Sequence, residues 1–130
     1  MRFQRRMRAM NEDKRQYVVL DTNALLMPFQ FKLNLDVELE RLVGSCEILV
    51  PSIVMEELDN TKDPNSNAAK KLAGKYKLLP AKGSGDQGIL QAAIDIRAVL
   101  VTNDKELGKR ARDLGLRTIS MKKRSHLVWD

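Results

Sequence analysis

YVVLDTNALL, residues 17–26, is the stretch that decides the fold, because it joins a β-branched apolar run directly to an acid. The apolar run does not alternate with polar residues, and this pattern predicts a buried strand of a parallel sheet over 17–21. A short helix is expected to follow from Asn23 to about Phe29. Asp21 therefore stands where a buried strand ends, and open α/β sheets form their sites beyond such ends.

The same succession of strand and helix continues along the chain. Further strands are predicted over 46–51, 77–80, 98–102 and 116–121. Helices are predicted over 34–43, 52–62, 67–76, 85–97 and 104–115. This alternation indicates an α/β domain with a mostly parallel sheet flanked by helices. Residues 1–16 are interpreted as a basic N-terminal arm, and 17–130 as one domain with a basic C-terminal end.

Composition excludes several classes of protein. Of the 130 residues, 43% are hydrophobic and 31% charged, which is an ordinary globular mixture. No apolar run approaches the roughly 20 residues of a membrane span, and the N-terminus has no apolar signal core, so a cytoplasmic protein is expected. One cysteine, Cys46, and one histidine, His126, exclude an internal disulfide, a Cys-rich zinc site and a His-based triad. If the protein is an enzyme, carboxylates must carry the chemistry.

The net charge of +6 is concentrated at the two ends of the chain. Residues 1–16 hold six basic and two acidic side chains, and residues 117–130 hold four basic and one acidic. A near-neutral body with basic ends is typical of a protein that binds a polyanion, although solubility alone would also account for it. The cations predicted to contact such a partner are Arg2, Arg5, Arg6, Arg8, Lys14, Arg15, Lys122, Lys123 and Arg124.

Four acids are predicted to converge at one edge of the sheet. Asp21 ends the first strand, the helix after the second carries Glu56 and Glu57, Asp86 lies where the helix over 85–97 begins, and Asp104 follows the strand over 98–102. Their mutual repulsion would be relieved by a divalent cation, and carboxylates are the hard ligands that Mg²⁺ and Mn²⁺ accept.

Each acid also has a purely structural interpretation. Asp21 fits the N-cap of its helix, and one of Glu56 and Glu57 is expected to be a solvated helix acid. Asn103 with Glu106, and Ser84 with Gln87, both fit the spacing of a capping box. These two boxes would leave Asp104 and Asp86 free for other roles.

Together these segments resemble the PIN-domain nuclease family. VVLDTNALL (18–26), VPSIVMEEL (50–58), GSGDQGILQAAI (83–94) and AVLVTNDKEL (98–107) resemble its four motifs, in order. The gaps between Asp21, Glu57, Asp86 and Asp104 are 36, 29 and 18 residues, which fit the family. The resemblance covers about 17–121. It departs from the family at Gln87, where many members carry a second acid, so one or two metal ions are expected.

The resemblance implies a three-layer α/β/α fold around a five-stranded parallel sheet, and a metal-dependent endoribonuclease. It implies that Asp21, Glu57, Asp86 and Asp104 hold Mg²⁺ or Mn²⁺. Asn23, Thr102 and Asn103 are the implied polar helpers. The basic arm favours the archaeal and eukaryotic subgroup that processes ribosomal RNA over the toxin–antitoxin ribonucleases. RNA is the expected partner, with a homodimer, an antitoxin or a ribosome-assembly protein as further candidates, and no membrane.

Two other classes of function compete with this interpretation. A non-catalytic RNA- or protein-binding module on the same fold would use the basic ends and retain the acids without chemistry. A phospho-accepting receiver-like domain would place Asp21 at a strand end and use Thr102 as a switch, but it needs paired acids near the first strand. The four acids in order favour the nuclease.

Overall fold

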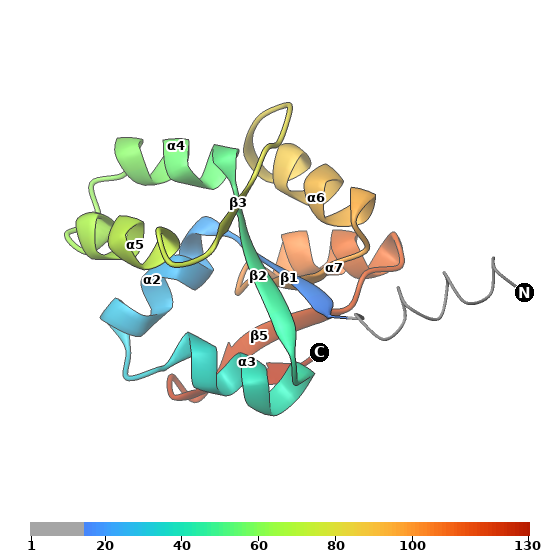
Figure 1. The fold of residues 1–130 in the computed structure, drawn as a ribbon, viewed down its shortest axis with the longest axis horizontal. Helices are drawn as coiled ribbons and strands as arrows, with labels where there is room; N and C mark the ends of the chain where they lie inside the picture. Colours follow the sequence, from blue (N-terminus) through green and yellow to red (C-terminus); the bar gives the residue numbers. More distant parts are fainter. Residues whose placement is uncertain (1–14) are drawn as a thin grey trace, which may run out of the picture.

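The computed structural model describes residues 15–130, so the basic arm up to Lys14 lies outside the described residues. Twelve helices and strands follow one another in this part of the chain (Figure 1). In order they are β1 (Gln16–Leu20), α2 (Thr22–Gln30), α3 (Leu35–Val43), β2 (Cys46–Pro51), α4 (Ser52–Asn60), α5 (Ser66–Ala73), β3 (Lys77–Leu79), α6 (Gly85–Asp95), β4 (Val99–Val101), α7 (Lys105–Asp113), β5 (Thr118–Lys122) and β6 (His126–Trp129).

The described strands form one sheet in the order β3-β2-β1-β4-β5-β6. β1 pairs in parallel with β2 on one side and with β4 on the other. β3 and β5 extend the sheet in parallel, and β6 pairs antiparallel with β5. Because the chain leaves β1 toward β2 and later returns to β4, the carboxyl ends of β1 and β4 form the topological switch point of the sheet.

Helices cover both faces of the sheet. Right-handed crossovers place α2 to α5 on one face and α6 and α7 on the other. The contacts among α2, α4 and α5 and those between α6 and α7 agree with this division, and α4 also contacts α6 (Figure 1). The predicted α/β/α fold is therefore confirmed.

The apolar core lies at the middle of the sheet. Val18, Val19 and Leu20 of β1 have no exposed surface, and β4 is buried throughout. A strand buried on both faces needs apolar residues at every position, which is why neither strand shows an alternating pattern. The rigid centre of the fold thus carries the two strand ends from which Asp21 and Asp104 continue.

The sheet has six strands where five were predicted. β6 follows β5 through a tight turn, in which Lys123 and Arg124 both have positive φ, of 56° and 61°. Such a turn usually has Asn or Gly at these positions, so its sequence gives no turn signal. The outer backbone groups of Leu127 in β6 are bonded by α3, because Glu38 accepts from its N–H at 2.8 Å and Arg41 donates to its carbonyl at 2.8 Å.

No helix over 15–130 combines the length and the apolar character that crossing a bilayer requires.

Candidate active site at the switch point

Asp21 is the buried centre of the site. It directly follows β1, and only 4% of its surface is exposed. Its Oδ1 accepts a hydrogen bond from the backbone N–H of Ala24 at 2.8 Å, so Asp21 is also the N-cap of α2, one of the roles that its position in the sequence allowed. Its own N–H donates to the carbonyl of Val101 at 3.3 Å, which fixes it against the end of β4.

Asp21 is held in an environment that disfavours its charge. Burial is the main cause that raises its pKa from 3.8 to about 6. The negative charges of Asp86 and Asp104 raise it further, whereas hydrogen bonds from the Thr102 side chain and the Ala24 backbone lower it. The structure therefore brings two of the predicted acids, Asp86 and Asp104, within electrostatic range of a third, Asp21. A buried acid with a strongly raised pKa beside two like charges marks a candidate functional site.

The end of β4 supplies Thr102 and Asp104. The buried Thr102 side chain accepts from the backbone N–H of Asp104 at 3.0 Å. Oδ1 of Asp104 accepts from the N–H groups of Glu106 and Leu107 at 2.9 and 3.0 Å, so Asp104 is the N-cap of α7. Both bonds end on Oδ1, and Oδ2 takes none from the described residues. Asp104 is only partly exposed.

The capping box predicted for Asn103 and Glu106 is wrong. Asn103 lies one residue before the cap, and its Oδ1 instead accepts from the backbone N–H of Met121 in β5 at 2.8 Å. The spacing rule failed because two adjacent residues, Asn103 and Asp104, are both good caps, and the bond to β5 holds Asn103 away from the helix. Asn103 thus stands at the rim of the site with its carbonyl oxygen occupied.

Glu57 reaches the site from α4. Its Oε1 accepts a hydrogen bond from the hydroxyl of Thr22, the residue after Asp21. Glu57 is partly buried, whereas the neighbouring Glu56 is exposed. Thr22 was not among the predicted polar helpers, although it stands in the same DTN triplet as Asn23. Asn23 itself is exposed on the first turn of α2, where it makes no side-chain hydrogen bond within the described chain.

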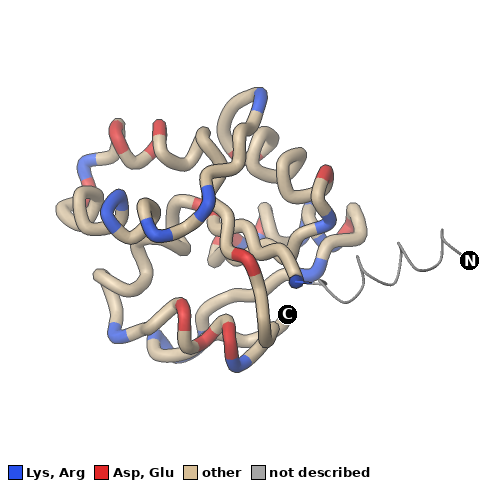
Figure 2. The backbone as a smooth tube through the Cα atoms, in the orientation of Figure 1, with Lys and Arg blue, Asp and Glu red and all other residues tan. Residues whose placement is uncertain are grey.

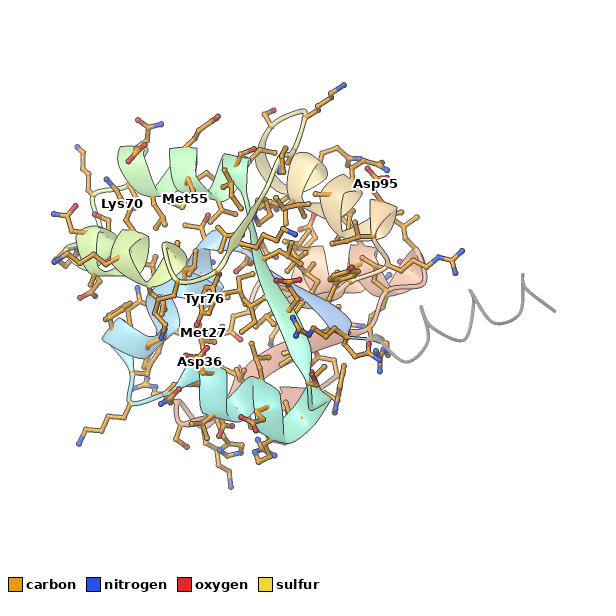
Figure 3. The ribbon with its side chains drawn as sticks, viewed as in Figure 1. Met27, Asp36, Met55, Lys70, Tyr76 and Asp95 are labelled. Carbon is orange, nitrogen blue, oxygen red and sulfur yellow. The ribbon has the colours of Figure 1, made fainter. Side chains whose placement is uncertain are left out.

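Asp86 is presented by the first turn of α6, close to α4. Gly88 makes this approach possible, because a Cβ at that position would collide with Ile53 of α4 and lie 3.0 Å from the carbonyl of Lys82. A shallow depression lined by Glu57, Glu56, Ser84 and Gly85 joins the two helices. The remaining acid of α6, Asp95, is exposed, bonds with Gln91 and lies on the outer side of the helix (Figure 3).

The second predicted capping box is also wrong. Ser84 occupies the N-cap position of α6 but makes no side-chain bond to the helix. Gln87 instead accepts from Arg110 of α7 at 2.6 Å, which ties α6 to α7. The Gln87 side chain bonds to Arg110 on another helix instead of to the backbone of Ser84. A single sequence gives no sign of that long-range contact. Asp86 is exposed at the start of α6.

The donor set fits a small, hard divalent cation. Within 15–130, no three His, Cys, Asp or Glu side chains are gathered closely enough to enclose an ion directly. Mg²⁺ typically keeps several waters and is held through one or two carboxylates, so widely spaced acids suit it better than a tight cage. Burial, with a smaller contribution from repulsion by Asp86 and Asp104, raises the pKa of Asp21, and a bound cation would offset both by favouring the charged carboxylate.

The predicted polyanion contacts fall in two groups. Those from Arg2 to Lys14 lie outside the described residues. Arg15 is exposed just before β1. The other three, Lys122 at the end of β5 and Lys123 and Arg124 in the turn that follows, are exposed. Because β5 runs parallel to β4, this turn projects from the same edge of the sheet as Asp104.

The cations of α5 and of the segment after it lie away from this edge. Figure 2 shows Lys and Arg along α5 and the segment after it, and acids on α3 and α4. One acid of α3, Asp36, accepts from the hydroxyl of Tyr76 at 2.8 Å and from Lys75 at 3.0 Å, so it joins the end of α5 to α3 (Figure 3). Asp36 and Lys75 are therefore used within the fold and add nothing to the site.

Comparison with known proteins places this geometry in context. The family described as "PIN like domain" matches residues 18–124. Ribonuclease VapC4 of Methanocaldococcus jannaschii is 35% identical over 105 residues, which cover 72% of this chain and 80% of that protein. Ribonuclease VapC9 of Archaeoglobus fulgidus is 28% identical over 111 residues, covering 80% of this chain and 82% of its own.

A solved structure shares the fold. The PIN domain endonuclease Utp24 superposes with a TM-score of 0.76 and 24% sequence identity. The match covers 88% of this chain and 90% of that one. The arrangement of strands and helices described above is therefore a known one.

Proposed function

Since the chain belongs to the PIN-domain nuclease family, we propose that it is an endoribonuclease that hydrolyses RNA phosphodiester bonds with Mg²⁺ or Mn²⁺. The observation that carries the proposal is the buried Asp21, with Asp86 and Asp104 both raising its pKa at the switch point of the sheet. A fold that only binds a partner has no need to bury an acid beside two others, because such an arrangement costs stability.

RNA as the substrate rests on two supports. Two relatives that match most of this chain bear the name ribonuclease. In addition, the exposed Lys122, Lys123 and Arg124 project at the edge of the sheet where Asp104 lies. Cations at that place attract the phosphate backbone of a nucleic acid independently of its sequence.

Asp21, Asp104 and Asp86 are the residues that would hold the cation, with Glu57 completing the set directly or through water. When bound, such a cation lowers the pKa of a coordinated water and neutralises charge on the scissile phosphate. The side chain of Thr102 stabilises the charged form of Asp21 by its hydrogen bond. The Thr22 hydroxyl orients Glu57 toward α2. Asn23, exposed beside them, is placed to contact a phosphate oxygen.

For the physiological role, the basic residues of the N-terminal arm favour ribosomal-RNA processing as the first candidate, with a ribosome-assembly protein as partner. A toxin-type ribonuclease restrained by an antitoxin is the second, and the two relatives named VapC are the observation that favours it. Induced expression separates them. A toxin arrests growth unless Asp104 is replaced by asparagine, and co-expression of an antitoxin restores growth. A processing enzyme leaves growth unchanged.

Cleavage of a labelled single-stranded RNA tests the proposed activity. The wild-type protein should cleave in Mn²⁺ or Mg²⁺ and not in EDTA. Asp104→Asn should be inactive yet folded, because the asparagine Oδ1 can still accept from Glu106 and Leu107. Full activity of folded Asp104→Asn would overturn the assignment of the site.

A further inference from the structure

The surface beside Asp104 is hollowed between α7 and β5. This hollow, called here the α7–β5 hollow, has a volume of about 600 Å³, and Thr102, Asn103, Asp104, Lys105, Lys109 and Met121 are among the residues that line it. Thr102 contacts Asp21 as well, so the hollow opens directly from the site. Its volume lies in the range of pockets that bind small organic ligands.

Asn103 presents hydrogen-bond donors at the rim of the hollow. Its Oδ1 accepts from the N–H of Met121, which holds the side-chain amide in one orientation. The Nδ2 group then offers two N–H donors, and no acceptor among residues 15–130 takes them. Donors with a fixed direction next to Asp104, one of the residues proposed to hold the cation, suit an acceptor on a bound ligand.

Two lysines supply positive charge at the same hollow. Lys109 pairs only with Asp113, at 3.2 Å, and both side chains are largely exposed. An ion pair of this kind is weak and exchanges readily for another partner. Lys105 is exposed and has no side-chain partner in the described part of the chain. Lys105 and Lys109 are therefore available to an anion.

Apart from Asp104, which belongs to the site itself, the other charges of the hollow satisfy one another. Arg112 donates to the Thr118 hydroxyl at 2.6 Å and lies 3.7 Å from Asp130. Asp130 in turn accepts from Ser120 and Thr118, at 2.7 and 2.9 Å. These side chains are therefore occupied by bonds between α7, β5 and Asp130. Lys105, Lys109 and Asn103 remain as the groups that can recognise a ligand.

We propose that the α7–β5 hollow binds the RNA nucleotide next to the scissile bond. Lys105 and Lys109 pair with its phosphate, and Nδ2 of Asn103 donates to an acceptor on its base or sugar. The inference rests on the proposed function, because it deepens the same site. It gives Asn103 the role of a positioning and specificity residue rather than that of a helix cap.

Asn103→Asp is the sharpest test of the amide. The substituted carboxylate can still accept from Met121, so the link to β5 is kept, but both N–H donors are lost. Gln87→Glu is the matched control, since it adds the same charge beside the acids, outside the hollow, and still accepts from Arg110. Binding of a labelled single-stranded RNA is measured in the Asp21→Asn background, which prevents cleavage. Asn103→Asp should weaken binding by about tenfold, and by several times more than the control.

The lysines are tested through the salt dependence of binding. Each phosphate contact contributes about 0.7 to the slope of log affinity against log salt for a single strand. Lys105→Gln combined with Lys109→Gln should therefore lower the slope by about 1.4, whereas Lys71→Gln on the opposite face should leave it unchanged. In the wild-type background the double variant should raise KM far more than it lowers kcat.

The outcomes separate this inference from the proposed function. If the wild-type protein cleaves RNA but neither Asn103→Asp nor the lysine pair changes binding beyond the controls, the subsite is wrong and the nuclease stands. If the protein neither binds nor cleaves RNA, the proposed function fails first. Equal effects of Asn103→Asp and Gln87→Glu would show that Asn103→Asp weakens binding only through its added negative charge. This result would overturn the assignment of Asn103 as a hydrogen-bond donor to the ligand.

Discussion

Replacing Asp21 by asparagine is expected to stabilise the metal-free protein at neutral pH while abolishing its activity. Asparagine keeps the shape of the side chain and caps a helix as well as aspartate does, so the bond from Ala24 is preserved. What it removes is a buried charge that lies near the charges of Asp86 and Asp104. A residue that serves only the fold would lose stability on replacement.

The size of the effect follows from the pKa of Asp21. The carboxyl titrates near 3.8 in the unfolded chain and near 6 in the native protein. Between these values the native protein keeps a proton that the unfolded chain has lost, so stability falls as the pH rises through this window. At about 1.36 kcal/mol per pH unit, the loss above pH 6 is about 3 kcal/mol. For a domain of this size that corresponds to about 10 °C in Tm.

Thermal unfolding of both proteins in EDTA, followed by circular dichroism from pH 4 to pH 8, measures this difference. Asp21→Asn should gain up to about 10 °C at pH 7 to 8, and the gain should shrink steadily toward pH 4. A gain that does not depend on pH would show that the charge of Asp21 is not its cause. A lower Tm for the variant at pH 8 would refute the claim that the buried charge of Asp21 destabilises the metal-free protein.

Three further outcomes are expected from the same geometry. Glu57→Gln should reduce cleavage far more than Glu56→Gln, because only Glu57 is bonded to Thr22 beside Asp21; steady-state rates in Mn²⁺ rank the two, and the reverse ranking would mean that Glu56 is the ligand. Mn²⁺ at one hundred times its Kd should raise the stability of the wild type by about 2.7 kcal/mol, measured by calorimetry, and should not do so in Asp21→Asn; an equal response of both proteins would place the ion elsewhere. Removal of residues 1–14, which hold five cations, should lower the salt slope of RNA binding by about 2 to 3.5 without changing preference among sequences; an unchanged slope would assign the arm to protein docking.

The fold was largely predictable because its strands are encoded in local pattern. The buried runs at β1 and β4 have no polar positions, and a glycine or proline lies near the end of several elements. β6 was missed because its turn uses Lys123 and Arg124 at positive φ, where the usual signal is Asn or Gly. The outer edge of β6 is held by hydrogen bonds between the backbone of Leu127 and the side chains of Glu38 and Arg41. These two residues lie on α3, about ninety residues earlier in the chain.

The site was predictable to the level of its elements but not of its hydrogen bonds. Topology alone brings Asp21 and Asp104 to the same edge, since β1 and β4 are parallel neighbours. Which of Asn103 and Asp104 caps α7 depends on the contact of Asn103 with Met121, a long-range bond that no spacing rule contains. The same limit hid Thr22, whose partner Glu57 lies 35 residues away.

The chemistry of the product ends tests the central claim most directly. A single-stranded RNA of defined sequence is incubated with the protein in Mn²⁺, and the new ends are analysed by mass spectrometry. If acids at the switch point support direct attack of water on phosphorus, the products carry a 5′ phosphate and a 3′ hydroxyl, and Asp104→Asn yields none. Products that end in a 2′,3′-cyclic phosphate, or cleavage that persists in EDTA, would contradict it.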